Sequence, residues 1–433
     1  MKILSCLLSI AVVLSSMVFP VCADNTRFLT AWELQSELRA GINIGNSLDA
    51  FQGAGIADYG VGQETYWGNP RITRELLQAF ADKGFSTVRL PVTWSTHTTG
   101  DYVIDSAWLA RVKEVVEIAL DEGFYVILNS HHDSYDVNPN NTDRLEYEKV
   151  ADEVSAIWAQ VAPYFKDYPD TLVFETMNEP NNPNGWTWYN GKNPDPQLVD
   201  AVNRLNSDAY NIIRNSGGNN DKRNIIFATA GASIEGLNAI TDVPDEHILF
   251  EVHLYPNAEV ASGETTKIVH TADEIAEIQA RIGAPVVIDE CGFISDWDSS
   301  YAEDGDRSIV AAKVMFEALS KYGIPSALWD NGYGFGILDR KTYEYKNGTA
   351  EGVALAALNA YGVRNPNQPK LGDIDNDGYL TVMDIVLYKQ SLANWTSAPK
   401  LSDIINIADI DGDGKTDILD VVLLTREVIQ AHA

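Results

Sequence analysis

Cysteine is scarce in this chain of 433 residues, which contains three. Cys6 and Cys22 lie in an N-terminal segment that we expect to be removed, which leaves Cys291 alone. A mature chain with one cysteine cannot form an internal disulfide, but it is long enough to bury a large core. We interpret Cys291 as a small buried thiol rather than a nucleophile, because no histidine or base accompanies it in its motif.

Basic residues are also few. The chain has 31 lysines and arginines against 62 aspartates and glutamates, a net charge of −31. Nucleic acids and anionic membrane surfaces are bound through basic patches, so we expect neither as a partner. The acidic composition suits a secreted protein that acts on a neutral polymer.

The N-terminal apolar run is the one that resembles a targeting segment. A charged start, an apolar stretch over residues 3–13 and the small-residue site Val21-Cys22-Ala23 predict a signal peptide over residues 1–23. The run is too short for a permanent transmembrane helix, so we expect no membrane association after cleavage. Cys22 would allow a lipoprotein, but the residues before it do not resemble a lipobox.

Short β-rich runs alternate with amphipathic segments over residues 24–363. Strands are expected over residues 41–45, 87–90, 125–129, 172–176, 225–229, 249–253, 286–289 and 326–329, and helices over 107–122, 147–166, 197–215, 272–282 and 307–322. Eight strands interleaved with helices predict an α/β fold, a (β/α)8 TIM barrel. An open doubly wound sheet is the competitor, but no glycine-rich phosphate fingerprint follows the first strand.

Two glutamates lie at the ends of predicted strands. Glu179 follows one strand in Asn178-Glu179-Pro180, and Glu290 ends another. An isolated motif of this kind is usually an ordinary polar turn. In a parallel barrel, however, the carboxyl ends of the strands carry the chemistry. Two carboxylates on two strand ends are the minimum equipment for cutting a glycosidic bond.

Further motifs lie in order between residues 41 and 336. They are Gly41-Ile42-Asn43-Ile44-Gly45-Asn46, Trp67-Gly68-Asn69-Pro70, Arg89-Leu90-Pro91-Val92-Thr93-Trp94, His131-His132-Asp133, Asn178-Glu179-Pro180, His253-Leu254-Tyr255, Asp289-Glu290-Cys291-Gly292 and Trp329-Asp330-Asn331. Together they resemble family 5 glycoside hydrolases, and within them the secreted bacterial endoglucanases and xyloglucanases of subfamily 4. The resemblance implies retaining cleavage of internal β-1,4-glucosidic bonds in cellulose and related β-glucans, including xyloglucan, without a catalytic cofactor.

The resemblance also implies roles for individual residues. Glu179 would be the proton donor and base, and Glu290 the nucleophile held ionised by Arg89 and Tyr255. The chemistry requires Glu179 to stay protonated near the working pH. Side chains expected to bind the sugar or orient the pair are Asn46, Trp94, His131, His132, Asn178, His253 and Trp329. Zinc at the histidine pair is disfavoured because the sequence shows no third ligand at metal spacing.

Tryptophan side chains other than Trp329 could extend a substrate groove, although core packing is an equal alternative for each of them. These residues are Trp67, Trp94, Trp186, Trp188 and Trp297. A β-mannanase or another hemicellulase on the same barrel is the nearest alternative function, since only the groove would differ. A non-catalytic carbohydrate-binding subunit is a more distant one, because binding alone has no need of paired carboxylates.

The chain changes character after residue 363. Residues 364–370 have two prolines and no core former, which predicts a linker. In residues 371–433 an Asp-Ile-Asp-x-Asp-Gly motif occurs twice, each time before an apolar helix, and both copies fit the EF-hand calcium loop. The predicted ligands are Asp373, Asp375, Asp377, Asp384, Asp409, Asp411, Asp413, Asp417 and Asp420.

Two departures from a standard EF-hand are informative. Aspartate replaces glutamate at position 12, and no helix clearly precedes either loop. Both resemble a type I dockerin, which implies two structural calcium ions, a cohesin domain of a scaffolding protein as partner, and an extracellular location on a cellulosome. Val382-Met383 and Ile418-Leu419 fall where such modules choose their partner, and here they are apolar.

Overall fold

The computed structural model describes residues 28–52, 60–133, 144–181, 196–362, 372, 374, 382–395, 398–410 and 415–430. The expected signal peptide and linker lie outside these residues. So do Trp186, Trp188 and the predicted calcium ligands Asp373, Asp375, Asp377, Asp411 and Asp413. Within the described ranges, no helix is both long and apolar enough to cross a membrane.

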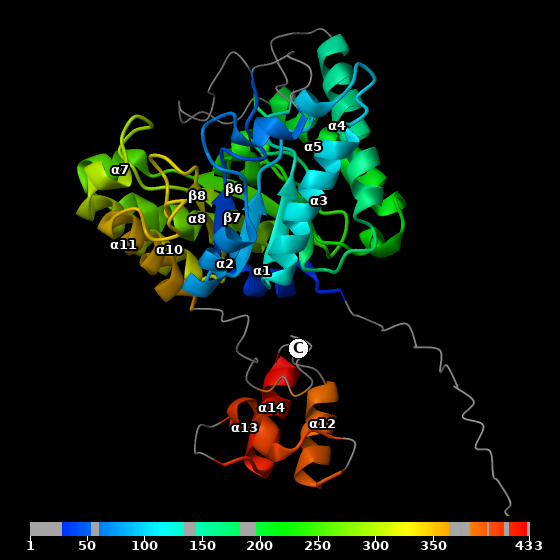
Figure 1. Ribbon diagram of the computed structural model, residues 1–433, viewed down its shortest axis with the longest axis vertical. Coiled ribbons are helices and arrows are strands. Elements are labelled where there is room, and N and C mark those ends of the chain that lie inside the picture. The colour runs from blue at the N-terminus through cyan, green and yellow to red at the C-terminus, as the bar shows by residue number, and fades with distance from the viewer. Residues whose placement is uncertain are drawn as a thin grey trace, which may run out of the picture.

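Eight parallel strands form a closed barrel in sequence order, with β8 paired to β1 (Figure 1). The strands are β1 Ala40–Ile44, β2 Thr87–Leu90, β3 Tyr125–Asn129, β4 Leu172–Glu175, β5 Ile225–Phe227, β6 Ile248–Leu254, β7 Val286–Cys291 and β8 Ser326–Asp330. The predicted TIM barrel is therefore confirmed. Each expected strand is present, but β5 is two residues shorter than expected and β6 and β7 are two longer.

Helices surround the strands, as Figure 1 shows. They are α1 Ala31–Leu38, α2 Arg74–Lys83, α3 Ser106–Asp121, α4 Arg144–Tyr164, α5 Pro196–Asn215, α6 Ile234–Asn238, α7 Asn257–Ser262, α8 Thr266–Ile282, α9 Tyr301–Asp304, α10 Asp306–Ser320 and α11 Gly348–Tyr361. Short 3-10 turns η1 Gly60–Thr65, η2 Ser95–His97, η4 Gly218–Asp221 and η5 Ala230–Ala232 lie in the loops. The apolar stripes of the long helices pack on the outward side chains of the strands, because both surfaces exclude water in doing so.

Helix α1 closes the amino end of the barrel. Thr30 and Glu33 form a capping box that fixes its first turn. Its buried Leu34 and Leu38 pack against inward side chains near the start of the strands, among them Ile127 and Val287. These apolar residues fill the lower half of the barrel interior, so the chemistry of the site is confined to the upper half.

The strand period places a polar layer directly above this apolar one. Side chains alternate along a strand, so residues two apart share a face. In β3, β4, β6 and β7 the last inward apolar residue is followed two positions later by a buried polar one. These polar residues are Asn129, Glu175, Glu251 and Asp289.

The C-terminal region contains α12 Val382–Leu392, α13 Leu401–Ala408 and α14 Ile418–Gln430, whose buried residues form a core of their own. Helices α12 and α14 follow the two loops as expected. Helix α13 corrects the expectation that no helix precedes either loop, because it ends directly before the second one. Its β-branched isoleucines obscured the helical period, although Ile404, Ile407 and Ala408 are buried along one side.

The position of α1 leads to a stability prediction. Leu34→Ala should lower the free energy of unfolding by about 3 kcal/mol, since it leaves a cavity where the barrel floor is sealed. Ser36→Ala, on the exposed side of the same helix, is the matched control and should change it by less than about 0.5 kcal/mol. Urea unfolding followed by tryptophan fluorescence measures both. Equal stability of the two variants would contradict the sealing role of α1.

Candidate active site

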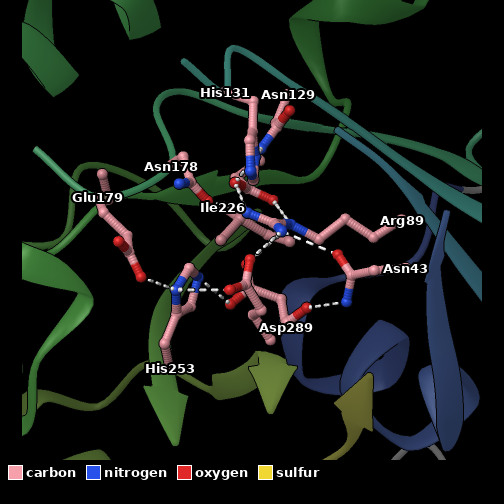
Figure 2. A network of polar contacts seen from close by, with 12 residues as sticks. Asn43, Arg89, Asn129, His131, Asn178, Glu179, Ile226, His253 and Asp289 are labelled. Carbon is pink, nitrogen blue, oxygen red and sulfur yellow. Dashed lines mark hydrogen bonds and ion pairs between the residues drawn. The ribbon is translucent and has the colours of Figure 1, made fainter. Parts of the chain in front are cut away.

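A buried guanidinium lies at the centre of the polar layer. Arg89 of β2 uses all five of its N–H groups (Figure 2). Nε and Nη2 each donate to Glu175 at 2.7 Å, Nη2 donates also to Asn178 at 2.7 Å, and Nη1 donates to Asn43 at 2.8 Å and Glu290 at 3.0 Å. A planar fork suits this role because each N–H has a fixed direction. Arg89 thereby connects side chains from three other strand ends.

Glu290 of β7 receives a donor on each carboxylate oxygen. Arg89 Nη1 donates to Oε2 at 3.0 Å, and the Tyr255 hydroxyl donates to Oε1 at 2.6 Å. Burial and the charge of Glu290 raise the pKa of Tyr255 well above its ordinary value, so the phenol keeps its proton. Donors of this kind favour the ionised form of a carboxyl group.

Glu179 has a different environment. It follows β4 on the loop that Pro180 begins, and its side chain is 37% exposed. Its Oε1 lies 2.6 Å from Nδ1 of His253 on β6. One carboxylate oxygen of Glu179, one of Glu290 and a ring nitrogen of His253 lie within 4.8 Å of one another. The two glutamates expected at the centre of the chemistry are thus close together.

The pKa values of His253 and Glu179 are shifted in opposite directions. Burial disfavours the imidazolium, yet the charge of Glu290 and hydrogen bonds to Asp289 and Glu179 raise the pKa of His253 to about 10. Burial likewise would raise the pKa of Glu179, but the hydrogen bond and charge of His253 lower it overall. In the free protein the shared proton therefore lies on His253, with Glu179 ionised, which differs from the expectation of a protonated Glu179.

Two histidines line another part of the site. His131 stacks on Trp329 with ring centroids 5.6 Å apart and 8° between planes, and meets the edge of His132 at 4.5 Å. Burial and the neighbouring charges of His132, Arg89 and His253 lower the pKa of His131 well below its ordinary value. Its ring is therefore neutral and can accept a hydrogen bond.

Asp49 adds a third possible metal ligand that the sequence reasoning missed. One of its oxygens and one ring nitrogen each of His131 and His132 lie within 4.8 Å of one another. The expectation that this pair has no third ligand was therefore wrong. The Asp49 carboxylate already accepts the backbone N–H groups of Asn46 at 3.0 Å and Ser47 at 2.7 Å, so its burial is explained without a metal ion.

The tryptophans divide between core and groove. Trp94 is 1% exposed and its Nε1 donates to the carbonyl of Asn129 at 2.9 Å. Of the two alternatives open for this ring, core packing against β3 is therefore the one observed, and the ring is not available to bind a sugar as was also expected. Trp329 lies close against Gly45, where a Cβ would come within 2.5 Å of its ring. Trp297 is 51% exposed beside Tyr255, with ring centroids 4.8 Å apart, and is available to a ligand.

Several residues of the site were not anticipated from the sequence. They are Asn43, Asn129, Glu175, Glu251 and Asp289, all buried in the polar layer. A charged residue inside an otherwise apolar strand was the available signal, since such a group is rarely buried without a partner.

A cavity of about 510 Å³ opens on one side of the pair. It is lined by Glu179, His253, Tyr255 and Trp297 and by the loops after β5 and β6, but Glu290 does not line it. The cavity therefore extends from the Glu179 side of the site.

Comparisons with known proteins agree with this arrangement. The profile of cellulase (glycosyl hydrolase family 5) matches residues 52–334, and that of the dockerin type I domain matches residues 371–429. The chain belongs to glycosyl hydrolase family 5 and carries a C-terminal type I dockerin. Endoglucanase A of Ruminococcus albus is 37% identical over 343 residues, which cover 74% of this chain and 90% of that protein.

Solved structures give the same result. A broad-specificity endoglucanase from Ruminococcus flavefaciens superposes with a TM-score of 0.69 at 33% identity, covering 77% of this chain and 99% of the other. A xyloglucan-specific endo-β-1,4-glucanase from a metagenomic library, solved with cellotriose, gives 0.67 at 31% identity, covering 76% and 98%.

The position of the proton can be measured directly. His253 should titrate with a midpoint near pH 10, so its contribution to stability is fully present below the ordinary histidine pKa and is lost as the pH rises through about 10. Glu179→Gln removes one of the groups that raise the His253 pKa and should lower the midpoint. Nuclear magnetic resonance of the His253 ring measures it. An ordinary midpoint in the wild type would show that the proton lies elsewhere.

Proposed function

We propose that this chain is a retaining endo-β-1,4-glucanase that hydrolyses internal bonds of cellulose and related β-glucans, including xyloglucan. The observation that carries the proposal is the approach of a Glu179 oxygen and a Glu290 oxygen to within 4.8 Å in a family 5 barrel. Retaining enzymes hold their two carboxyl groups about 5–5.5 Å apart, whereas inverting enzymes leave about 6.5–9.5 Å for a water molecule. The short distance favours the two-step, retaining reaction.

In the first step Glu290 attacks the anomeric carbon. Arg89 and Tyr255 each donate a hydrogen bond to one of its carboxylate oxygens and so orient the carboxylate toward the sugar. Asn178, held by Arg89, is placed to contact the 2-hydroxyl, an interaction that strengthens in the transition state. His131, Asn46 and Trp329 would contact the same sugar unit, with Trp329 as a stacking surface.

The leaving oxygen takes its proton from Glu179. In the free enzyme that proton lies on His253, 2.6 Å away. Substrate binding excludes water from the site, and a neutral acid beside a neutral imidazole is then favoured over an ion pair. The proton moves to Glu179 across the existing hydrogen bond and from there to the leaving group.

In the second step Glu179 acts as base. The glycosyl–enzyme bond neutralises Glu290, and Glu179, ionised after proton donation, removes a proton from the attacking water. The oxygen of that water breaks the ester bond and releases the sugar with its original configuration.

The cavity beside Glu179 supports cleavage at an internal bond of a polymer, because it leaves room for sugar units beyond the scissile bond. The leaving part of the chain lies on the side of the acid, which is where the cavity beside Glu179 and the exposed Trp297 are found. The similar xyloglucan-specific enzyme acts on a branched β-glucan, and we include xyloglucan among the substrates on that ground.

The dockerin is proposed to bind two calcium ions. The residues present fit this role, because Asp384 and Asp420 are both buried and both accept a backbone N–H at 2.8 Å from the start of their own loop, Ile374 and Ile410 respectively. Together with Asp409 and Asp417 they would hold calcium, with the remaining ligands outside the described residues. Calcium would neutralise carboxylates that otherwise repel one another.

A cohesin domain is the proposed partner of this module. Val382 and Met383 of α12 and Ile418 and Leu419 of α14 are each more than half exposed, so both copies of the repeat present an apolar surface. Large exposed apolar residues in a small domain mark an interaction site. The module would attach the enzyme to a scaffolding protein outside the cell, after cleavage of a signal peptide over residues 1–23. We propose 24–363, 364–370 and 371–433 as the catalytic domain, linker and dockerin.

The catalytic pair can be tested by mutation. Glu290→Gln should reduce kcat by about four decades, because no nucleophile remains. Glu179→Ala should reduce hydrolysis of polymer by about 10²–10⁴-fold, spare the first step on substrates with good leaving groups, and be partly rescued by azide. The assay is reducing-sugar release from cellulose, xyloglucan, lichenan, xylan and mannan. Full activity of either variant, or release chiefly from mannan, would reject this function.

The dockerin can be tested by calcium removal. A segment of residues 371–433 has too small a core to fold without metal or disulfides, so it should be largely unfolded with chelator and helical with calcium by circular dichroism. In the intact chain, chelation should abolish capture by immobilised cohesin and leave hydrolysis of soluble β-glucan unchanged. Identical spectra with and without calcium would contradict the proposal.

A further inference from the structure

The polar layer under the catalytic pair contains more acids than cations. Glu175 of β4, Glu251 of β6 and Asp289 of β7 are all fully buried, and among the described residues the cations beside them are Arg89 and the His253 imidazolium. Of these three acids, Arg89 donates N–H groups to Glu175 alone. Its shortest distance to Asp289 is 3.9 Å, from Nε to Oδ2. The layer therefore has negative charge that Arg89 does not compensate.

Glu251 is the least compensated of these acids. In the part of the chain that the structure describes, neither of its oxygens has a hydrogen-bond partner. Asp289, by contrast, has Nε2 of His253 at 3.5 Å. Yet one oxygen of Glu251, one of Asp289 and a ring nitrogen of His253 lie within 4.8 Å of one another. An ionised Glu251, away from water and this close to the Asp289 carboxylate, would be an unpaired buried charge beside a like charge, which proteins avoid by retaining a proton.

We propose that Glu251 is a permanently protonated carboxylic acid that donates to Asp289 and, through Asp289, positions the proton of the His253–Glu179 pair. The proposal rests on the proposed function, since it concerns the proton that Glu179 delivers. Glu251 is a positioning residue and does not touch the substrate. The charged groups that act on it are Arg89 from β2, Glu175 and Glu179 from β4 and the loop after it, and Asp289 from β7, and His253 of its own strand lies beside it.

The electrostatics support this assignment. Burial, and after it the charges of Asp289 and Glu175, raise the pKa of Glu251 well above its ordinary value, and Arg89 offsets this only in part. The Asp289 carboxylate lies 3.5 Å from Nε2 of His253 and favours the imidazolium. An ionised Glu251 would add a second negative charge here, hold the proton on His253 more firmly, and hinder its transfer to Glu179.

Infrared spectroscopy of the intact enzyme tests the protonation state. The wild type at pH 9, above the pKa of about 7 to which burial raises Glu175, should show the carbonyl stretch of a protonated carboxyl group, and Glu251→Gln should lose it. Glu277→Gln, an exposed glutamate on α8, is the matched control and should retain the band. Absence of the band in the wild type, or its persistence in Glu251→Gln, would overturn the proposal whatever the activity of the enzyme is.

The pH profile of kcat/KM provides the second test. Gln keeps a donor toward Asp289, so the alkaline limb of Glu251→Gln should coincide with that of the wild type. Glu251→Leu, which lacks the donor, should lose about tenfold or more in kcat, because the Asp289 carboxylate is left unsatisfied. Asp289→Asn removes the charge beside His253 and should move the alkaline limb to lower pH.

The opposite results are equally distinct. An ionised Glu251 would make Glu251→Gln itself move the alkaline limb to lower pH, since a negative charge near His253 would be lost. If Gln failed to rescue the loss seen with Leu, Glu251 would act only through packing. If Glu179 and Glu290 variants retained full activity, the proposed function would fail, while the infrared result would stand independently.

Discussion

The ion pair between Arg89 and Glu175 is the constraint on which the rest of the site depends. Its two hydrogen bonds of 2.7 Å are fully buried, and removal of either partner would leave an uncompensated charge at a cost of about 3–5 kcal/mol. With Glu175 fixing the plane of the guanidinium, the remaining N–H groups can point only at Asn43, Asn178 and Glu290. The nucleophile Glu290 is thus oriented by Arg89 of β2, and the position of Arg89 is set by Glu175 of β4.

The second constraint is the supply of protons to a layer rich in acids. Arg89 and His253 supply two positive charges. Five carboxyl groups surround them, those of Glu175, Glu179, Glu251, Asp289 and Glu290. Protons must therefore be retained inside the barrel. The structure distributes them unequally between Glu251, far from solvent, and the His253–Glu179 pair at the mouth. A proton held between two groups 2.6 Å apart can move with a small change of environment, which is what an acid that later serves as a base requires.

The sequence predicted the barrel, the catalytic pair as candidates, and the C-terminal repeat, because strand ends, prolines and repeated aspartates are local signals. Trp94 shows the limit of local signals, since its motif does not distinguish a ring in the groove from the observed ring that is buried and bonded to the Asn129 carbonyl of β3. Glu175, Glu251 and Asp289 were missed because their importance comes from the convergence of distant strands on Arg89. The protonation of His253 depends on the sum of three carboxylates, Asp289 and Glu290 of β7 and Glu179 of the loop after β4, which no single motif records.

The central claim is that Glu290 forms a bond to the sugar and Glu179 serves first as acid and then as base. The most direct measurement is proton magnetic resonance of the anomeric signals during early hydrolysis of a soluble β-glucan, before mutarotation. The account predicts that the β-anomer of the new reducing end appears first, with the α-anomer growing later by mutarotation. Initial appearance of the α-anomer would contradict it, because it would require direct attack of water on the opposite face.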